Sequence, residues 1–217
     1  MTQLPATVYV VDDDAAMRAS LEFMFTDTGL PVRAYASAEA FLEDMPPQMQ
    51  GCLILDLRMP GMNGYELHQR LKALGRHLPV IMLTGHGDVP AAVDEMKLGA
   101  FDFLAKPVNR EVLLGRVREA IEADLARRQQ GEETADIEGK LAALSARELE
   151  VMGHVARGQA NKEIARQLGI SERTVANHRA HLLHKIGASN TADMVRMLGV
   201  VGRLDQRAVE APSPPPG

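Results

Sequence analysis

The chain has 217 residues, which is enough for one large domain or two modest ones. Hydrophobic residues make up 46% of it and charged residues 24%, so a wholly disordered chain is excluded. No apolar run reaches about 18 residues, and no basic segment followed by an apolar block opens the chain, so we expect a cytoplasmic protein with no membrane span and no secretory signal. The single Cys52 lies in an apolar run, which indicates a buried, inert thiol.

The charge is unevenly placed along the chain. Residues 141–200 contain eight Lys and Arg against five Asp and Glu, a net charge of +3, whereas the whole chain carries −5. A slightly basic segment attached to an acidic one is a modest indication of a nucleic-acid partner.

Short apolar runs alternate with helical stretches over the first 125 residues. Five runs are strand-like: 8–11, 32–35, 52–55, 80–83 and 101–104. Apolar residues recur at helical spacing between and after them, over 17–25, 40–41, 67–74, 89–96 and 109–127. Strands that alternate with helices pair in parallel and are buried on both faces. Residues 1–125 are therefore predicted to form an α/β domain with a five-stranded, doubly wound parallel sheet.

The remaining residues predict a different architecture. Residues 126–140 are polar without periodicity and are predicted to be a linker. Strand-like runs vanish over 141–203, where apolar residues recur at helical spacing, so a small all-α domain is expected. The tail 204–217 ends in APSPPPG and is expected to be disordered.

Polar residues follow successive strands of the first domain. Asp12 and Asp13 follow the first strand, Asp56 and Thr84 end the third and fourth, and Lys106 follows the fifth. Carboxyl ends of parallel strands share one rim of the sheet, where ligands gather. Carboxylates that cluster there suit Mg²⁺ or Mn²⁺, and Asp56 can then attack phosphorus while Lys106 neutralises phosphoryl charge. Each residue alone has a plain structural explanation, such as a helix cap or a surface turn, and the set of them indicates chemistry.

The stretches VYVVDDD, LDLRMPGMNG, LTGHGDVPAAV and FDFLAKP resemble the receiver domain of two-component response regulators, a flavodoxin-like fold. The resemblance implies that Asp56 is the phosphoacceptor and that a sensor histidine kinase is the partner. It implies a metal ion held by Asp13, Asp56 and the backbone carbonyl of Arg58, with Asp12 acting through water. Thr84 and Phe103 match the switch pair, Lys106 matches the phosphate-binding lysine, and a cis peptide bond is expected at Lys106-Pro107.

An enzyme is the rival interpretation of the same carboxylates. Haloacid-dehalogenase-type phosphatases also use an aspartyl nucleophile after a strand, but they need a second Asp two positions later. That position is Arg58 here, so we expect a switch that is not an enzyme. The resemblance to receiver domains further implies that Arg58 and His86, two residues after Asp56 and Thr84, tune how water reaches the acyl phosphate.

The second domain shows the spacing of a helix-turn-helix. Ser145 and Glu148 form a capping box before a helix that is expected to end near Gly158. A second helix over 161–168, a turn at Gly169 and a third helix capped by Ser171 follow.

The third helix can be phased by its apolar residues. Val175, Leu182 and Ile186 must face inward, so the outward residues near its start are Thr174, Ala176, Asn177, Ala180 and His181. Asn177 can contact adenine and the alanines a thymine methyl, whereas phosphate contacts are expected from Lys162, Arg173, Thr174 and Lys185. Arg179 is borderline by phase. The plain alternative is an amphipathic helix with a solvated face.

The stretches LSARELEV, ANKEIARQLGIS and TVANHRAHLLHKIGA resemble the LuxR/FixJ class of DNA-binding domain, with Asn161, Lys162, Thr174, Val175, His178 and Lys185 matching its pattern. His178 is equally compatible with packing against the core. The resemblance to FixJ/NarL regulators implies binding to double-stranded DNA, transcriptional activation, and a phosphorylation-dependent homodimer through the surface 88–104. Two alternatives stay open: a LuxR-type regulator that senses a small ligand, and a receiver whose output domain binds protein or RNA.

Overall fold

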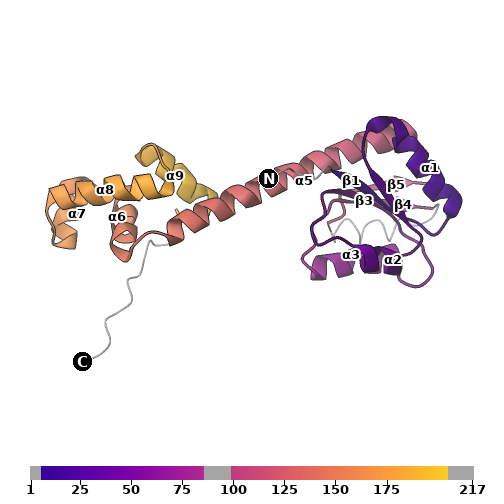
Figure 1. Cartoon of the computed structure of the whole chain (residues 1–217), viewed down its shortest axis with the longest axis horizontal. Coiled ribbons are helices and arrows are strands. Elements are labelled where there is room, and N and C mark those ends of the chain that lie inside the picture. The colour runs from indigo at the N-terminus through magenta and orange to yellow at the C-terminus, as the bar shows by residue number, and fades with distance from the viewer. Residues whose placement is uncertain (1–5, 86–98, 205–217) are drawn as a thin grey trace, which may run out of the picture. The chain divides into compact units, whose positions relative to one another are not determined.

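A computed structural model describes residues 6–85 and 99–204 of the chain. By its internal contacts the chain divides into two compact units, Met1–Arg128 and Gln129–Gly217, and each is described by itself (Figure 1). Several sequence-based expectations lie outside the described residues: the helix at 89–96, the role of His86, most of the surface 88–104 and the tail from 205. Among the described residues, no helix is both long and apolar enough to cross a membrane.

The first unit contains a five-stranded parallel sheet in the order β2-β1-β3-β4-β5, which confirms the predicted fold class. The strands are β1 (Thr7–Val11), β2 (Val32–Tyr35), β3 (Gly51–Asp56), β4 (Val80–Thr84) and β5 (Asp102–Ala105). Every residue of β3 and β4 is buried, as expected of central parallel strands covered on both faces.

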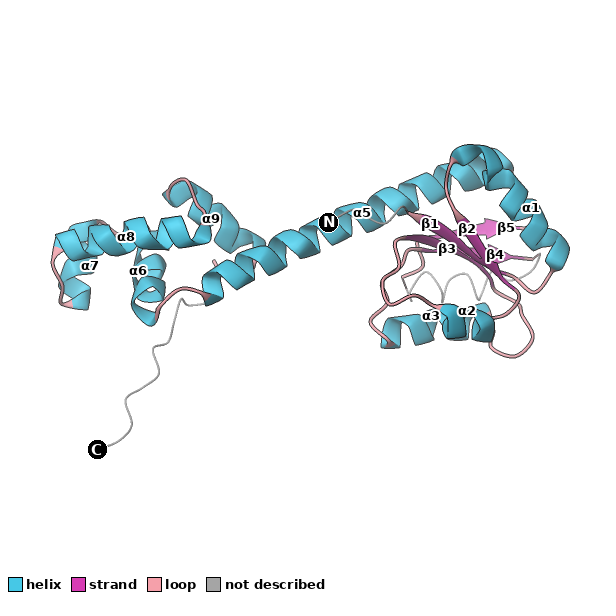
Figure 2. Cartoon of the chain, in the orientation of Figure 1, coloured by secondary structure: helices cyan, strands magenta, loops and turns pink. Residues whose placement is uncertain are grey.

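Helices cover both faces of this sheet (Figure 2). Alternate strand residues point to opposite faces, so Tyr9 and Val11 pack with α2 and α3, whereas Val8 and Val10 pack with α1 and α5. These helices are α1 (Ala15–Phe25), α2 (Ala38–Asp44), α3 (Gly64–Ala73) and α5 (Arg110–Ala142). A short 3₁₀ turn, Thr26–Thr28, follows α1.

Short polar side chains start the helices at the rim of the sheet. Asp14 caps α1 by accepting hydrogen bonds from the backbone N–H groups of Ala16 and Met17. Asn63 begins α3 in a capping box with Glu66. The first residue of α3, Gly64, lies so close to β3 that a Cβ there would be 2.3 Å from the backbone oxygen of Asp56. Only glycine therefore allows α3 to start directly beside Asp56.

The structure differs from the expectation over residues 128–140, where α5 continues as helix to Ala142 instead of giving way to a polar linker. Ile137 and Leu141, four residues apart, are buried in the core of the second unit, and Lys140 pairs with Asp136 at 2.6 Å. Two apolar residues are too few to give a recognisable periodicity in the sequence. Their burial stabilises the helix, because most of the other residues in this segment have a good helix propensity.

The second unit is all-helical, as predicted. Beyond the end of α5 it contains α6 (Ala146–Ala156), α7 (Asn161–Leu168), α8 (Glu172–Ile186) and α9 (Thr191–Val200). Ser145 and Glu148 form the expected capping box at α6, and Gly169 adopts the left-handed conformation between α7 and α8. Val175, Leu182 and Ile186 are buried in the core, which confirms the phase assigned to α8.

Candidate functional site

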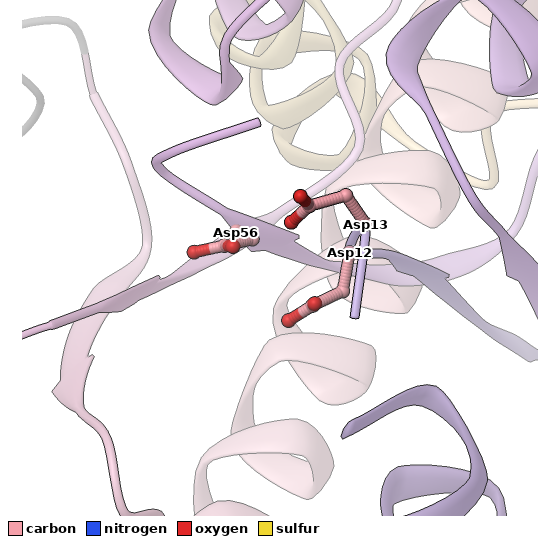
Figure 3. A group of neighbouring side chains, drawn as sticks. All are labelled: Asp12, Asp13 and Asp56. Carbon is pink, nitrogen blue, oxygen red and sulfur yellow. The ribbon is translucent and has the colours of Figure 1, made fainter. Parts of the chain in front are cut away.

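Three carboxylates converge at the carboxyl ends of β1 and β3. One oxygen from each of Asp12, Asp13 and Asp56 lies within 4.8 Å of the others (Figure 3). Asp12 and Asp56 are buried and Asp13 is exposed. The backbone N–H of Asp14 donates to Asp12 Oδ1 at 2.9 Å, and Arg18 donates to the Asp12 carbonyl at 2.7 Å, so the loop after β1 is fixed around the cluster.

Lys106 supplies the cation beside these carboxylates. Its Nζ lies 2.8 Å from Asp12 Oδ2 and 3.1 Å from Asp56 Oδ2. Burial raises the pKa of Asp56, and Lys106 opposes that shift by hydrogen bonding and charge. Burial alone would lower the pKa of Lys106, but its bonds to Asp12 and Asp56 raise it overall. Lys106 therefore stays protonated and holds a negatively charged pocket together.

The donor set fits a hard divalent cation. The pocket offers a small number of carboxylate oxygens that lie close together, and one of the carboxylates, Asp13, is exposed to water. Such a set suits Mg²⁺, which keeps several of its waters and accepts phosphate oxygens as ligands. Asp12, Asp13 and Asp56 together carry more negative charge than the single Lys106 ammonium balances. The pocket thus has the composition of a Mg²⁺ site.

The other expected site residues lie around this pocket in different ways. Thr84 is buried at the end of β4, with its hydroxyl 3.1 Å from the carbonyl oxygen of Gly85. Phe103 is half-buried against the core on the α2–α3 face of the sheet. The exposed Arg58 approaches Asp56 through its backbone N–H, 3.4 Å from Oδ1. The peptide bond Lys106-Pro107 is cis, as expected.

The loop after Asp56 is held by a residue that the sequence did not single out. Glu39, in the first turn of α2, accepts a hydrogen bond from the backbone N–H of Met62 at 3.0 Å. Hydrogen bonds from its own backbone N–H and from that of Met62 lower the pKa of Glu39. A Cβ on Gly61, whose φ is 74°, would lie 3.0 Å from the same carboxylate. The side chain from α2 therefore shapes the segment that links β3 to α3.

The helix-turn-helix presents its expected base-reading residues to solvent. Ala176, Asn177, Ala180 and His181 are exposed, whereas His178 is partly buried. Lys162 and Arg173 are also exposed. Thr174 is partly buried, with its hydroxyl 2.8 Å from that of the cap residue Ser171. Four of the five residues expected to face outward are thus exposed, and their contact with DNA stays a prediction.

Lys185 and Asn161, also of the expected DNA-binding set, likewise have partners inside the protein. Lys185 Nζ lies 2.7 Å from Glu148 Oε2, and the same carboxylate oxygen accepts from the backbone N–H and the hydroxyl of Ser145. These bonds hold the pKa of Glu148 at about 2. Asn161 accepts a hydrogen bond from Arg179. The capping box revealed one function of Glu148 from the sequence, but no local signal predicted its bond to α8.

Comparison with known proteins matches both parts of the chain. Residues 8–118 match the family model of the response regulator receiver domain, and residues 142–198 match that of bacterial regulatory proteins of the luxR family. The transcriptional regulatory protein FixJ of Azorhizobium caulinodans is 43% identical over 195 residues, covering 90% of this chain and 92% of that protein. Nodulation protein W of Bradyrhizobium diazoefficiens is 42% identical, covering 91% of this chain and 87% of that protein.

A solved structure shows the same likeness. The structure of the response regulator StyR matches with a TM-score of 0.83 and 38% sequence identity. The match covers 90% of this chain and 99% of the StyR chain. Each part of the chain is thus matched by a family model of its own. The chain belongs to the FixJ-like family of two-component response regulators, transcription regulators that are not enzymes and that join a receiver to a LuxR-type helix-turn-helix.

Proposed function

We propose that a partner histidine kinase phosphorylates Asp56 and that the phosphorylated chain dimerises, binds promoter DNA in the cytoplasm and activates transcription. The observation that carries this proposal is the convergence of Asp12, Asp13, Asp56 and Lys106 at one rim, on a chain that also carries a LuxR-type domain. In functional terms we divide the chain into a receiver at 1–125, a connecting segment at 126–140, a DNA-binding domain at 141–203 and a tail at 204–217.

The chemistry is a phosphoryl transfer to a carboxylate. An oxygen of Asp56 attacks phosphorus, the bond from phosphorus to the kinase histidine breaks, and that histidine nitrogen leaves with the electron pair. Mg²⁺ or Mn²⁺, held by Asp13, Asp56 and the Arg58 carbonyl with Asp12 behind a water, would neutralise the phosphoryl oxygens. Lys106 pairs with Asp56 in the unphosphorylated protein and is close enough to pair with an oxygen of the phosphoryl group on Asp56.

The response to phosphate begins with Thr84 and Phe103. The Thr84 hydroxyl donates to the phosphoryl group, and Phe103 moves into the space that it leaves. The surface 88–104 then changes and pairs two receivers. A tenfold shift between resting and active states needs only about 1.4 kcal/mol of differential stabilisation. Arg58 and His86 are proposed to set how long the acyl phosphate survives water.

The DNA interface is proposed on α8 and the start of α7. Ala176, Asn177, Ala180 and His181 read bases, and phosphate contacts come from Asn161, Lys162, Arg173, Thr174 and Lys185. Lys185 can serve both partners, because an ammonium has three donors and its side chain is 44% exposed beside Glu148. Two protomers would place two copies of α8 on neighbouring half-sites.

Three measurements test the proposal. The full chain is incubated with acetyl phosphate and Mg²⁺ and its intact mass is measured, with Asp56→Asn as the control. We expect one phosphoryl group on the wild type and none on the variant. The same samples are then centrifuged to equilibrium and used to enrich duplexes from a randomised DNA pool. A protein that is never labelled would favour the ligand-sensing alternative, and one that is labelled but enriches no DNA would favour a protein or RNA partner.

A further inference from the structure

The recognition helix α8 carries a partly buried arginine that is bonded within the protein. Arg179 Nη1 donates to the side-chain oxygen of Asn161 at 2.8 Å, and its Nη2 donates to Thr191 Oγ1 at 3.0 Å. Asn161 is the first residue of α7 and Thr191 is the first residue of α9. One guanidinium therefore ties the middle of α8 to the beginnings of two other helices.

The geometry suits arginine in particular. The guanidinium is planar and permanently charged, and its two terminal nitrogens can donate to two acceptors in a fixed arrangement. A lysine ammonium at the end of a flexible stem would not hold two oxygens in one plane in the same way. Both acceptors here are uncharged, so the contact is directional hydrogen bonding rather than an ion pair.

The bond to Asn161 determines which end of that amide is presented. An asparagine side chain has one oxygen that accepts and one NH₂ group that only donates. Because the oxygen accepts from Arg179, the NH₂ group is the end that can donate to a phosphate oxygen. No other partner of this NH₂ group is found within the described segments 6–85 and 99–204. Asn161 is one of the proposed phosphate contacts, so its orientation matters for binding.

We propose that Arg179 is a positioning residue for DNA binding: it stays bonded to Asn161 and Thr191 and holds the Asn161 amide and the start of α7 in register with α8. It does not itself contact a phosphate. The inference rests on the proposed DNA-binding function, and it assigns to this arginine a role opposite to the one that its charge suggests.

The test uses the full chain, labelled with acetyl phosphate, on a duplex that the wild type has enriched from a randomised pool. Affinity is measured at several salt concentrations for Arg179→Met, Asn161→Ala, the double variant, and Arg173→Met as the matched control. Arg173 is exposed on the first turn of the same helix and is a proposed direct phosphate contact.

We expect Arg179→Met to weaken binding about tenfold, because a hydrogen bond from a charged donor is lost. The slope of log affinity against log salt should stay at the wild-type value, whereas Arg173→Met should reduce it by about 1. The double variant Arg179→Met/Asn161→Ala should bind no more weakly than the weaker single variant, since both changes remove one contact. The fold-losses of affinity caused by Arg173→Met and Asn161→Ala should instead multiply when the two changes are combined.

Three outcomes would overturn the inference: unchanged affinity of Arg179→Met, a salt slope that falls by about 1 as in the control, or effects of Arg179→Met and Asn161→Ala that multiply. If Arg179→Met does not fold, Thr191→Val removes one acceptor alone, and we expect it to weaken binding about threefold and to be non-additive with Asn161→Ala. An unchanged DNA affinity of Thr191→Val would also overturn the inference. If the wild type itself enriches no DNA, the proposed function falls together with the inference, whereas failure of the variants alone leaves the function standing.

Discussion

Gly64 offers the sharpest test of how α3 is fitted to the phosphoacceptor strand. Replacement by Ala would put a Cβ 2.3 Å from the backbone oxygen of Asp56 and 3.1 Å from Leu57 Cα. Both contacts are with backbone, so relief requires α3 or β3 to shift. Overpacking of this kind costs about 1–3 kcal/mol, and the closeness of the oxygen favours the upper end of that range.

The assay can be confined to the first unit. The chain has three tyrosines and no tryptophan, and Tyr9, Tyr35 and Tyr65 all lie in Met1–Arg128. Tyrosine fluorescence during a urea titration therefore reports unfolding of that unit. With a slope of about 2 kcal/mol per molar urea, a loss of 2–3 kcal/mol lowers the midpoint by roughly 1–1.5 M. In the absence of urea, acetyl phosphate should also label Gly64→Ala more slowly than the wild type, because the shift of β3 displaces Asp56.

Gly115 provides the matched control. It lies inside α5 in the same unit, and a Cβ there would meet nothing within 4 Å. Gly115→Ala should raise the free energy of unfolding by about 0.5–1 kcal/mol, since alanine loses less backbone entropy in a helix. A Gly64→Ala midpoint at or above the wild-type value, or an equal fall in both variants, would refute the packing argument.

Three further outcomes are expected. Lys106→Met should slow labelling by acetyl phosphate about 100-fold, because the phosphoryl oxygens lose a positioned cation, and an unchanged rate would remove Lys106 from the chemistry. Glu148 has a pKa of about 2 in the folded protein against an ordinary 4.5, so its stabilisation is complete above pH 4.5 and is lost as the pH falls toward 2. Glu148→Gln should flatten that part of the stability curve, which far-UV circular dichroism of urea unfolding can measure; a curve like that of the wild type would contradict the assignment. Asp124→Asn should lower the stability of the first unit by about 1–3 kcal/mol in the tyrosine assay, because the buried carboxylate accepts from Gly51 N–H at 3.0 Å and from Arg127 and Arg128 at 2.7 Å; no change would show that these bonds are dispensable.

The central strands of the sheet could be predicted from sequence because they have a strong local signal. A parallel strand that is buried on both faces is apolar throughout, and a run such as 52–55 is too short for an ordinary helix, so its length favours a strand. The extension of α5 has no such signal. Its helix from Gln129 onward depends on two side chains, Ile137 and Leu141, that are buried by residues far along the chain. Tertiary packing, which periodicity does not encode, decides that segment.

The rim of the sheet could also be predicted in outline. Strand ends determine which residues share the rim, so the positions of Asp12, Asp13, Asp56 and Lys106 in the sequence are enough to group them. Which oxygens Lys106 bonds in the resting protein depends on loop conformation. The support that Glu39 gives to the Met62 N–H comes from a different helix and was not foreseen.

The cations of α8 show the same limit in a form that bears on function. Lys185 and Arg179 have equal formal charge on one amphipathic helix, and the sequence alone distinguishes them only by phase. Lys185 keeps 44% of its side chain exposed and bonds one carboxylate, so its remaining donors can reach a phosphate. Arg179 has both terminal nitrogens bonded to oxygens of two other helices, so turning either toward DNA would break a contact that orders the domain. The acceptors within reach, which lie 12 to 37 residues away along the chain, therefore decide whether a basic residue on the recognition helix binds DNA or supports the residues that do.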